Sequence, residues 1–415
     1  MSNEPLEPKL IPKQPEINIG TTGHVDHGKT TFVEAITGVW TSAHSEELRR
    51  GITIRVGYAD AAFYKCPSCD SPECYSTDSI CIKCGSETEL LRVASFVDCP
   101  GHESLMANMI SGAALMDGSV LVIATNEKIP QPQTREHLLA LQMLGTKNIV
   151  IGQNKVDLVD DKGALEGYRS IKQLVKNTVA EKATIVPISA QNKINIDASI
   201  EAIEKNLPTP KRDLSAPSLM QLLRSFDINR PGIRISGLKG GVVGGTLIQG
   251  EIKIGDEIEI RPGLIEKDGK TKSIQTQVST IGTAAGLVEK ATPGGLIAIG
   301  TTLDPALTKS DSLLGSILGN PEHLPPVFEV LSMTTQLFDM AVGAPDLIKV
   351  DKIKKGEALR LNVGTAVTLG TVSSVKDDVI EVKLRRKVSA DKGNRIAISR
   401  RIFERWRLIG AGTLT

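Results

Sequence analysis

The segment Gly23-His-Val-Asp-His-Gly-Lys-Thr30 constrains the fold of this chain more than any other feature. It fits the pattern G-x-x-x-x-G-K-[ST], follows the apolar run 17–20 and precedes a helix-like run at 31–36. Glycines at this place let backbone N–H groups close around phosphates, and the following helix favours negative charge at its first turn. We therefore expect a strand, a phosphate-binding loop and a helix, with Lys29 reaching the β- and γ-phosphates and the Thr30 hydroxyl offered to Mg²⁺.

Alternating runs along residues 16–207 predict the fold class of the first half. Helix-like stretches at Pro132–Leu144 and Leu165–Ala180 separate short apolar runs, a pattern typical of βαβ units and a mostly parallel sheet. The apolar runs lie at 17–23, 94–100, 119–126, 148–154 and 183–189. We therefore expect an α/β domain around the phosphate loop.

The pattern changes after the segment 207–213, which combines two prolines with charge and suits a linker. Residues 214–325 and 327–415 carry short β-rich runs punctuated by glycine, with Pro325-Pro326 near the boundary between them. Such runs predict small antiparallel barrels. A chain of 415 residues has room for about two to four domains. We expect one α/β domain followed by two β-barrel domains.

Further motifs end apolar runs of the first domain. Asp98-Cys-Pro-Gly101 ends one run, which lets the Asp98 carboxylate hold a magnesium shell while the Gly101 N–H approaches a γ-phosphate. Asn154-Lys-Val-Asp157 ends another, where a carboxylate can accept both the N1–H and the exocyclic amine of guanine. Because adenine presents a different edge, the site should exclude ATP. Ser189-Ala190 completes the base pocket with a backbone donor to the guanine oxygen.

Four of the six cysteines form two C-x-x-C pairs separated by eleven residues. The pairs are Cys66 with Cys69 and Cys81 with Cys84. Two such turns can place four thiolates tetrahedrally around Zn²⁺, with no position left open for water. The alternatives are a disulfide or unpaired thiols. We expect a structural zinc knuckle at 64–86, with Cys74 a spare thiol and Cys99 a small apolar filler.

Together with Arg50-Gly-Ile-Thr-Ile54 and with His102 after Asp98-Cys-Pro-Gly, these motifs resemble the translational GTPases typified by elongation factor Tu. Signalling GTPases usually carry glutamine where this chain has His102. The resemblance implies that His102 orients the attacking water. Thr53 would coordinate Mg²⁺ while the γ-phosphate is present, so that its loop orders in the triphosphate state.

The cysteine pairs sharpen this resemblance, because elongation factor Tu has no such knuckle between its switch threonine and its Asp-x-x-Gly strand. The gamma-subunit family of archaeal and eukaryotic translation initiation factor 2 has one, and this chain is similar to that family from about Glu16 onward. The four-cysteine form is most like the archaeal proteins. The similar segments are Gly38–Gly51, Pro130–His137, Lys239–Gly245 and Arg405–Gly410.

Motifs and resemblance together indicate the functional residues. Catalysis would involve Lys29, Thr53 and His102. Mg²⁺ would be held by Thr30 and Thr53, and the resemblance implies further contacts from Asp26 and the Gly51 backbone. Alternatively, the Asp26 carboxylate holds the loop by accepting backbone N–H bonds. GTP or GDP would contact Asp26, His27, Gly28, Lys29, Thr30, Thr31, Asp98, Gly101, Asn154, Lys155, Asp157, Ser189, Ala190 and Gln191.

The resemblance implies a GTPase that carries methionyl initiator tRNA to the small ribosomal subunit, with alpha and beta subunits completing a three-subunit factor. GTP hydrolysis would switch it to release. Two alternatives stay open: an elongation-type carrier of aminoacyl or selenocysteinyl tRNA, and a regulatory module that binds nucleotide without hydrolysing it. The expected domains are a flexible leader at 1–15, a GTP-binding domain at 16–208, and β-barrels at 209–325 and 326–415.

Charge and hydropathy bear on partners and location. No apolar run approaches the roughly 18 residues of a membrane span, so we expect a cytoplasmic protein without a membrane partner. Residues 383–407 hold ten Lys and Arg against two acidic residues, a local charge of +8 in a chain of net charge +1. Such a segment is a candidate RNA-phosphate surface; the alternative is a set of solvated strands kept from aggregating.

Overall fold

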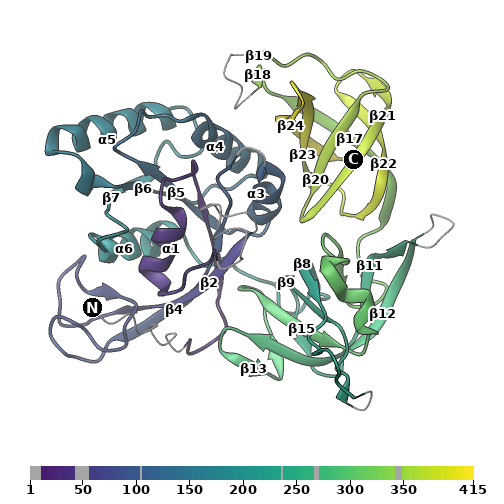
Figure 1. Cartoon of the computed structure of the whole chain (residues 1–415), viewed down its shortest axis with the longest axis horizontal. Helices are drawn as coiled ribbons and strands as arrows, with labels where there is room; N and C mark the ends of the chain where they lie inside the picture. The colour runs from purple at the N-terminus through teal and green to yellow at the C-terminus, as the bar shows by residue number, and fades with distance from the viewer. Residues whose placement is uncertain (1–10, 43–55, 103–104, 235–236, 266–270, 342–347) are drawn as a thin grey trace. The chain divides into compact units, whose positions relative to one another are not determined.

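The structure is a computed structural model that describes residues 11–42, 56–102, 105–234, 237–265, 271–341 and 348–415. The chain divides into two compact units, Met1–Pro210 and Lys211–Thr415, drawn in Figure 1. Most of the expected leader, at 1–10, lies outside the described residues, and residues 11–15 form no helix or strand. The division between the units falls inside the predicted linker.

A seven-stranded sheet with the order β3-β2-β4-β1-β5-β6-β7 forms the centre of the first unit (Figure 1). Its parallel strands are β1 (Ile17–Thr22), β4 (Glu89–Asp98), β5 (Gly118–Ala124), β6 (Ile149–Asn154) and β7 (Thr184–Pro187). The edge strands β2 (Gly57–Lys65) and β3 (Tyr75–Ser76) are antiparallel. The predicted mostly parallel sheet is confirmed, and each predicted apolar run supplies one parallel strand.

Helices cover both faces of this sheet. They are α1 (Lys29–Thr37), α3 (Met106–Ala113), α4 (Pro132–Leu144), the 3-10 turn η2 (Val156–Leu158), α5 (Asp161–Val175) and α6 (Ile196–Asn206). Successive side chains of β5 point to opposite faces. Val120 and Val122 pack in the core with α1 and α6, whereas Leu121 and Ile123 pack with α4 and α5. A strand buried on both faces reads as the continuous apolar run seen in the sequence.

Of the two helices predicted from the sequence, one has the predicted bounds and the other does not. α4 matches the prediction residue for residue, because proline occupies its first turn and Gly145, at a φ of 79°, ends it. The stretch predicted at Leu165–Ala180 is instead α5, which begins and ends earlier. Asp160 caps it by accepting from the Gly163 N–H at 2.8 Å, and the backbone leaves the helical region at Lys176.

The first β-rich section of the second unit closes into a barrel through pairing of β11 with β12. Its strand order is β11-β16-β8-β9-β15-β12, with β13 added at β12. The strands are β8 (Leu219–Phe226), β9 (Val242–Gln249), β11 (Glu257–Ile265), β12 (Thr271–Thr283), β13 (Gly286–Val288), β15 (Ile297–Thr301) and β16 (Ile317–Gly319). Two further features lie between these strands along the chain. They are a short strand pair, β10 (Ile252–Lys253) with β14 (Lys290–Ala291), and the 3-10 segment η4 (Pro305–Asp311).

The second β-rich section forms a closed barrel with the order β17-β22-β21-β20-β23-β24. Its strands are β17 (Val327–Leu337), β20 (Ala358–Val363), β21 (Ala366–Lys376), β22 (Val379–Ser389), β23 (Arg395–Ile402) and β24 (Arg405–Leu414); β18 (Met340–Ala341) and β19 (Ile348–Lys349) form a separate pair. Ile380, Val382 and Leu384 of β22 face the core, and Lys383 and Arg385, on either side of Leu384, are exposed. The predicted fold class is confirmed.

The cationic segment 383–407 is not a uniform surface. Arg386 donates through Nη2 to the Leu314 carbonyl at 2.9 Å, and Lys387 lies 3.3 Å from the Glu329 carboxylate. Arg400 pairs with the Glu357 carboxylate. Part of the positive charge therefore stabilises the second unit itself, while Lys383 and Arg385 remain exposed.

Candidate nucleotide site and metal centre

The phosphate-loop motif forms the turn between β1 and α1. Gly28 is the N-cap of α1 with a φ of 86°, and a Cβ there would lie 2.4 Å from the Asn154 amide. Only glycine fits this position without displacing that side chain. Backbone N–H groups at the start of α1 and the positive end of the helix can both face a bound phosphate.

Lys29, the first residue of α1, is buried and its Nζ donates to the His24 carbonyl at 2.7 Å. Burial lowers the pKa of Lys29 to about 8, although the Asp98 carboxylate opposes this shift. The amine therefore lies in a place where charge is costly. An anionic phosphate in the loop would supply the missing counter-charge and restore the pKa.

Asp98 ends β4 and is fully buried beside Thr21 of β1, its partner in the parallel register. Its Oδ1 accepts from the Thr21 hydroxyl at 2.8 Å. Its Oδ2 accepts from the hydroxyls of Thr30 at 2.7 Å and Thr41 at 2.6 Å. Carboxylate and hydroxyl oxygens are hard ligands of the kind Mg²⁺ takes. Thr30 and Asp98, the pair expected at the magnesium shell, are thus brought together and fit that ion.

A pocket of about 500 Å³ gathers most of the expected nucleotide-binding residues. Eleven of them line it, together with His102, which was expected as a catalytic residue. The eleven are Asp26, Gly28, Lys29, Thr30, Thr31, Gly101, Asn154, Lys155, Asp157, Ser189 and Gln191. Val25, Trp40, Ser42 and Leu158 complete the lining, and sequence reasoning gave them no role. The other three expected nucleotide-binding residues are buried and do not line the pocket, but their contacts hold the loops that form it. They are His27, Asp98 and Ala190.

At the base end of the pocket, Asn154 ties three loops together. Its Nδ2 donates to the His27 carbonyl at 2.8 Å, and its Oδ1 accepts from the Ala190 N–H at 3.0 Å. Asp157, on η2, accepts from the Asn192 amide at 3.1 Å, and the same amide lies 3.1 Å from the Ser189 hydroxyl. The loops after β6 and β7 are therefore joined where a guanine edge is expected.

Of four further residues expected at the site, two lie on the pocket wall and two lie outside the described residues. His102 lies on the pocket wall, and its carbonyl accepts from the Leu105 N–H at 2.9 Å. Asp26 lies on the same wall in a left-handed conformation with a φ of 61°. Thr53 and Gly51 lie outside the described residues, so their Mg²⁺ contacts stay predictions.

Buried histidines support the phosphate loop from behind, a role that sequence reasoning missed. His137 of α4 is fully buried and accepts the Gly23 N–H through Nδ1 at 2.9 Å. His27 Nδ1 lies 3.1 Å from the Val122 carbonyl, to which it donates. Burial lowers the pKa of His27 to about 3 and that of His137 well below its usual range, so both rings stay neutral. No local signal marks His137, because its partner lies 114 residues away.

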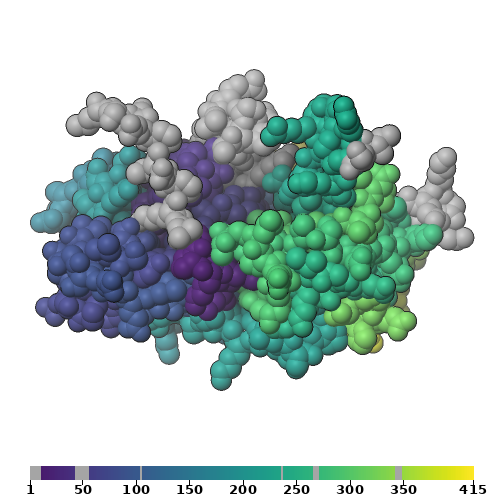
Figure 2. Space-filling model, turned by 90° about the horizontal axis from the view of Figure 1, so that it is seen from below, coloured from purple at the N-terminus to yellow at the C-terminus, as the bar shows by residue number. Residues whose placement is uncertain are grey.

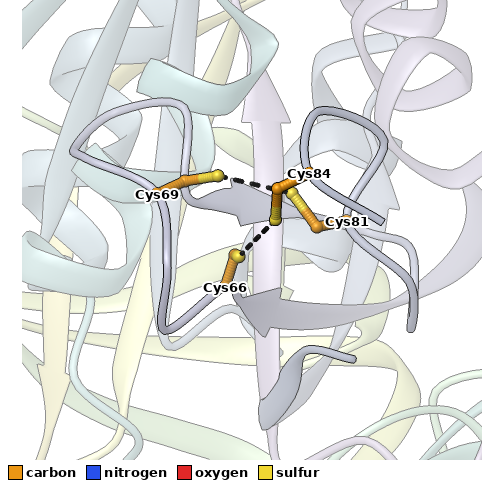
Figure 3. A group of neighbouring side chains, drawn as sticks. All are labelled: Cys66, Cys69, Cys81 and Cys84. Carbon is orange, nitrogen blue, oxygen red and sulfur yellow. Dashed lines mark hydrogen bonds between the residues drawn. The ribbon is translucent and has the colours of Figure 1, made fainter. Parts of the chain in front are cut away.

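The four paired cysteines converge in the segment between β2 and β4 (Figure 3). Their sulfur atoms all lie within 4.8 Å of one another, with Cys66 and Cys84 at 3.4 Å and Cys69 and Cys81 at 3.6 Å. Four thiolates around tetrahedral Zn²⁺ at about 2.3 Å would be about 3.8 Å apart. These separations fit zinc and are too long for disulfides, which need about 2.05 Å.

The remaining cysteines have other surroundings. Cys74 is buried against the cluster but is not one of its four ligand candidates. Cys99 is fully buried, and burial raises the pKa of its thiol, as suits a small apolar filler. Within the cluster, Cys84 is exposed and Cys69 is partly exposed, whereas Cys66 and Cys81 are buried. The segment that carries them is coloured blue in Figure 2. Ile82, between the last two ligand candidates, is 83% exposed.

Family models match both halves of the chain. Residues 14–209 match the elongation factor Tu GTP binding domain. Residues 329–414 match the C-terminal domain of initiation factor eIF2 gamma. The second match lies on the closed barrel that carries the cationic segment.

Curated relatives match nearly the whole chain. Translation initiation factor 2 subunit gamma of Archaeoglobus fulgidus is 58% identical over 400 residues, which cover 96% of this chain and 94% of that protein. The chain belongs to the family of translation initiation factor 2 subunit gamma. The protein of that name in Methanothermobacter thermautotrophicus is 56% identical and covers 97% of this chain and 99% of its own length. As a member of this family, the chain is a translation initiation GTPase, and the resemblance found from its motifs is confirmed.

Solved structures share the fold. Bacterial selenocysteine-specific elongation factor EF-Sec gives a TM-score of 0.72 at 24% identity, covering 96% of this chain and 58% of that one. Translation elongation factor SelB from Methanococcus maripaludis, solved in complex with the GTP analogue GppNHp, gives 0.71 at 21% identity, covering 97% and 79%. Identity this low establishes the common fold alone.

Among the described residues, no helix is long and apolar enough to cross a membrane.

Proposed function

We propose that this chain is the GTP-dependent carrier of methionyl initiator tRNA to the small ribosomal subunit, acting with alpha and beta subunits in one factor. The observation that carries the proposal is one pocket lined by phosphate-loop, magnesium and base-end residues, in a chain of the translation initiation factor 2 subunit gamma family. A GTP site in such a chain serves as a switch whose output is retention or release of a ligand.

In this proposal the phosphates bind at the start of α1. The backbone between Gly23 and Thr30 surrounds the α- and β-phosphates, and Lys29 exchanges the His24 carbonyl for phosphate oxygens. Thr30 and Asp98 would hold Mg²⁺, with Thr53, Asp26 and the Gly51 backbone as the further contacts. When bound, Mg²⁺ neutralises charge on the β- and γ-phosphates.

Guanine binds at the other end of the pocket. The Asp157 carboxylate accepts from N1–H and the exocyclic amine, and the backbone around Ala190 donates to the guanine oxygen. Asn154 positions both loops through its bonds to His27 and Ala190. Lys155, Ser189 and Gln191 form the surrounding wall.

The position of His102 on the pocket wall supports a role for it in hydrolysis. Its imidazole orients a water in line with the γ-phosphate; the water oxygen bonds to phosphorus as the bond to the β-phosphate oxygen breaks, which yields GDP and phosphate. Loss of the γ-phosphate removes its contacts to Thr53 and Gly101. The protein then favours the state with low affinity for tRNA, since a ligand shifts an equilibrium by its differential contacts.

The domains of this carrier are proposed as 16–208 for GTP and the zinc knuckle, with Zn²⁺ on Cys66, Cys69, Cys81 and Cys84, and 209–325 and 326–415 for the two barrels.

Single-turnover GTP hydrolysis, with and without small ribosomal subunits, tests the catalytic part. We expect His102→Ala to leave GTP affinity within a few-fold while slowing stimulated hydrolysis by about 10² or more, the scale of a lost water-orienting group. Normal turnover in the variant would assign the water to another group. Negligible hydrolysis by the wild-type protein under all conditions would favour the regulatory module instead.

A further inference from the structure

The Asp98 carboxylate accepts a hydrogen bond from Thr41, a residue that the proposed magnesium site does not include. Thr30 and Thr41 donate to the same oxygen, Oδ2, at 2.7 and 2.6 Å, while Thr21 donates to Oδ1. A carboxylate oxygen offers about two lone-pair sites. Both sites of Oδ2 are therefore occupied, at the oxygen that faces the proposed magnesium ligand.

Thr41 can reach Asp98 because a glycine in the sheet leaves space for its side chain. This space is called the notch. Gly57, the first residue of β2, pairs with Asp98 across the ladder. A Cβ on Gly57 would lie 2.6 Å from the Thr41 Cβ and 3.1 Å from its hydroxyl oxygen. The absence of a side chain at position 57 thus makes the space in which Thr41 reaches Asp98.

The two threonines differ in what Mg²⁺ would require of them. Thr30 can keep its hydrogen bond to Asp98 while it binds the ion, because a hydroxyl can donate through its hydrogen and bind a cation through its oxygen at the same time. Thr41 cannot stay, because Mg²⁺ or a water of its shell needs the lone pair of Oδ2 that Thr41 occupies. The Thr41 hydroxyl and the magnesium shell therefore compete for one acceptor.

We propose that Thr41 is a positioning residue that competes with the magnesium shell for Asp98 and leaves Asp98 when Mg²⁺ binds with nucleotide. This inference rests on the proposed nucleotide site. It makes the segment 40–42, which contributes Trp40 and Ser42 to the pocket wall, respond to the metal and not only to the nucleotide.

Trp40 provides a direct readout of this exchange. It is 45% exposed, its Nε1 donates to the Ser42 carbonyl at 3.0 Å, and it adjoins Thr41 in the chain. The chain has one other tryptophan, Trp406, so Trp406→Phe leaves Trp40 as the single fluorescent indole. Movement of Thr41 away from Asp98 should change the Trp40 emission.

The experiment titrates Mg²⁺ into the full chain saturated with GDP in the Trp406→Phe background, and follows both Trp40 emission and the GDP dissociation rate. Thr41→Val removes the hydroxyl at constant shape, and Thr41→Ser retains it as the matched control. Gly57→Ala fills the notch and displaces Thr41 without altering it. Both Thr41→Val and Gly57→Ala remove the contact between Thr41 and Asp98. If one of the two variants folds poorly, the other still tests the inference.

We expect Thr41→Val and Gly57→Ala to need about tenfold less Mg²⁺ for half-saturation, the scale of one hydrogen bond to a charged group, and to lose most of the Trp40 response. Thr41→Ser should behave as wild type. An unchanged or higher Mg²⁺ requirement in Thr41→Val and Gly57→Ala would overturn the inference alone. Loss of the proposed site itself would look different: GDP dissociation from the wild type would not depend on Mg²⁺, and Asp98→Asn would not accelerate it.

Discussion

At the scale of single residues, Asp157 carries the base specificity of the proposed site. Asp157→Asn should cost about 3 kcal/mol of GTP affinity, because two charge-assisted bonds are replaced by a mismatched amide. The same variant should gain affinity for the xanthine nucleotide, whose O2 can accept from the new amide. Calorimetric titration with both nucleotides measures this exchange; equal GTP affinity in variant and wild type would place the guanine edge elsewhere.

Lys29 gives the site a pH dependence. Its pKa is lowered to about 8 by burial, and a bound phosphate favours the charged amine and raises this pKa again. Nucleotide binding therefore takes up a proton above pH 8, and affinity falls as pH rises through that value. Between pH 7 and 8.5, GDP affinity should fall about fourfold.

The control for this titration is Lys29→Ala, whose weaker GDP affinity should be flat over the same interval. The interval stays below the range in which guanine N1–H itself titrates. A wild-type affinity that does not change up to pH 8.5 would show that Lys29 is already fully charged without nucleotide.

How far single residues could be predicted depends on the sequence distance to their partners. Lys29, Thr30 and Asp98 belong to short motifs whose spacing fixes their chemistry, so they could be named in advance. Thr41 lies 57 residues from Asp98, and His137 lies 114 from Gly23. Such contacts arise only when the sheet order brings the strand ends together, and no local pattern records them.

At the scale of elements, the cysteine knuckle should depend on its metal. Structural zinc supplies about 10 to 16 kcal/mol of binding free energy to such motifs. Cys66→Ser with Cys81→Ser should therefore release zinc and unfold the segment between β2 and β4, while GTP affinity changes little, because the pocket residues lie on other loops. Metal analysis and limited proteolysis measure both effects.

Cys74→Ser is the matched control, since Cys74 is buried beside the cluster without being one of the four ligand candidates. It should retain about one zinc per chain. Freshly purified wild-type protein with far less than one zinc would contradict the metal assignment.

Element boundaries were predictable where capping chemistry is local. The bounds of α4 follow from Pro132 and Gly145. The start of α5 does not follow from its apolar residues, because its cap is Asp160 and a polar first turn precedes Leu165. Two-residue strands such as β3 were not predicted, because they owe their pairing to neighbours and not to their own pattern.

At the scale of the whole molecule, alternation predicted two barrels but not their strand orders. The order β17-β22-β21-β20-β23-β24 closes through the pairing of β17 with β24, far apart in sequence. The sequence likewise predicted the positive charge of the cationic segment but not which of its side chains are exposed. Arg386 and Arg400, for example, bond to other residues of the second unit. Lys383 and Arg385 are exposed on β22 and are the better candidates for RNA phosphate contacts.

The central claim is that the bound nucleotide, GTP or GDP, sets the affinity of the protein for initiator tRNA. The most direct measurement is filter binding of methionyl initiator tRNA to the chain, across a salt series, with a non-hydrolysable GTP analogue and with GDP. We predict an affinity at least about tenfold higher with the analogue, about 1.4 kcal/mol of coupling, a steep fall of affinity with salt in both states, and weaker binding of elongator tRNA. Equal affinity in the two nucleotide states would contradict the account.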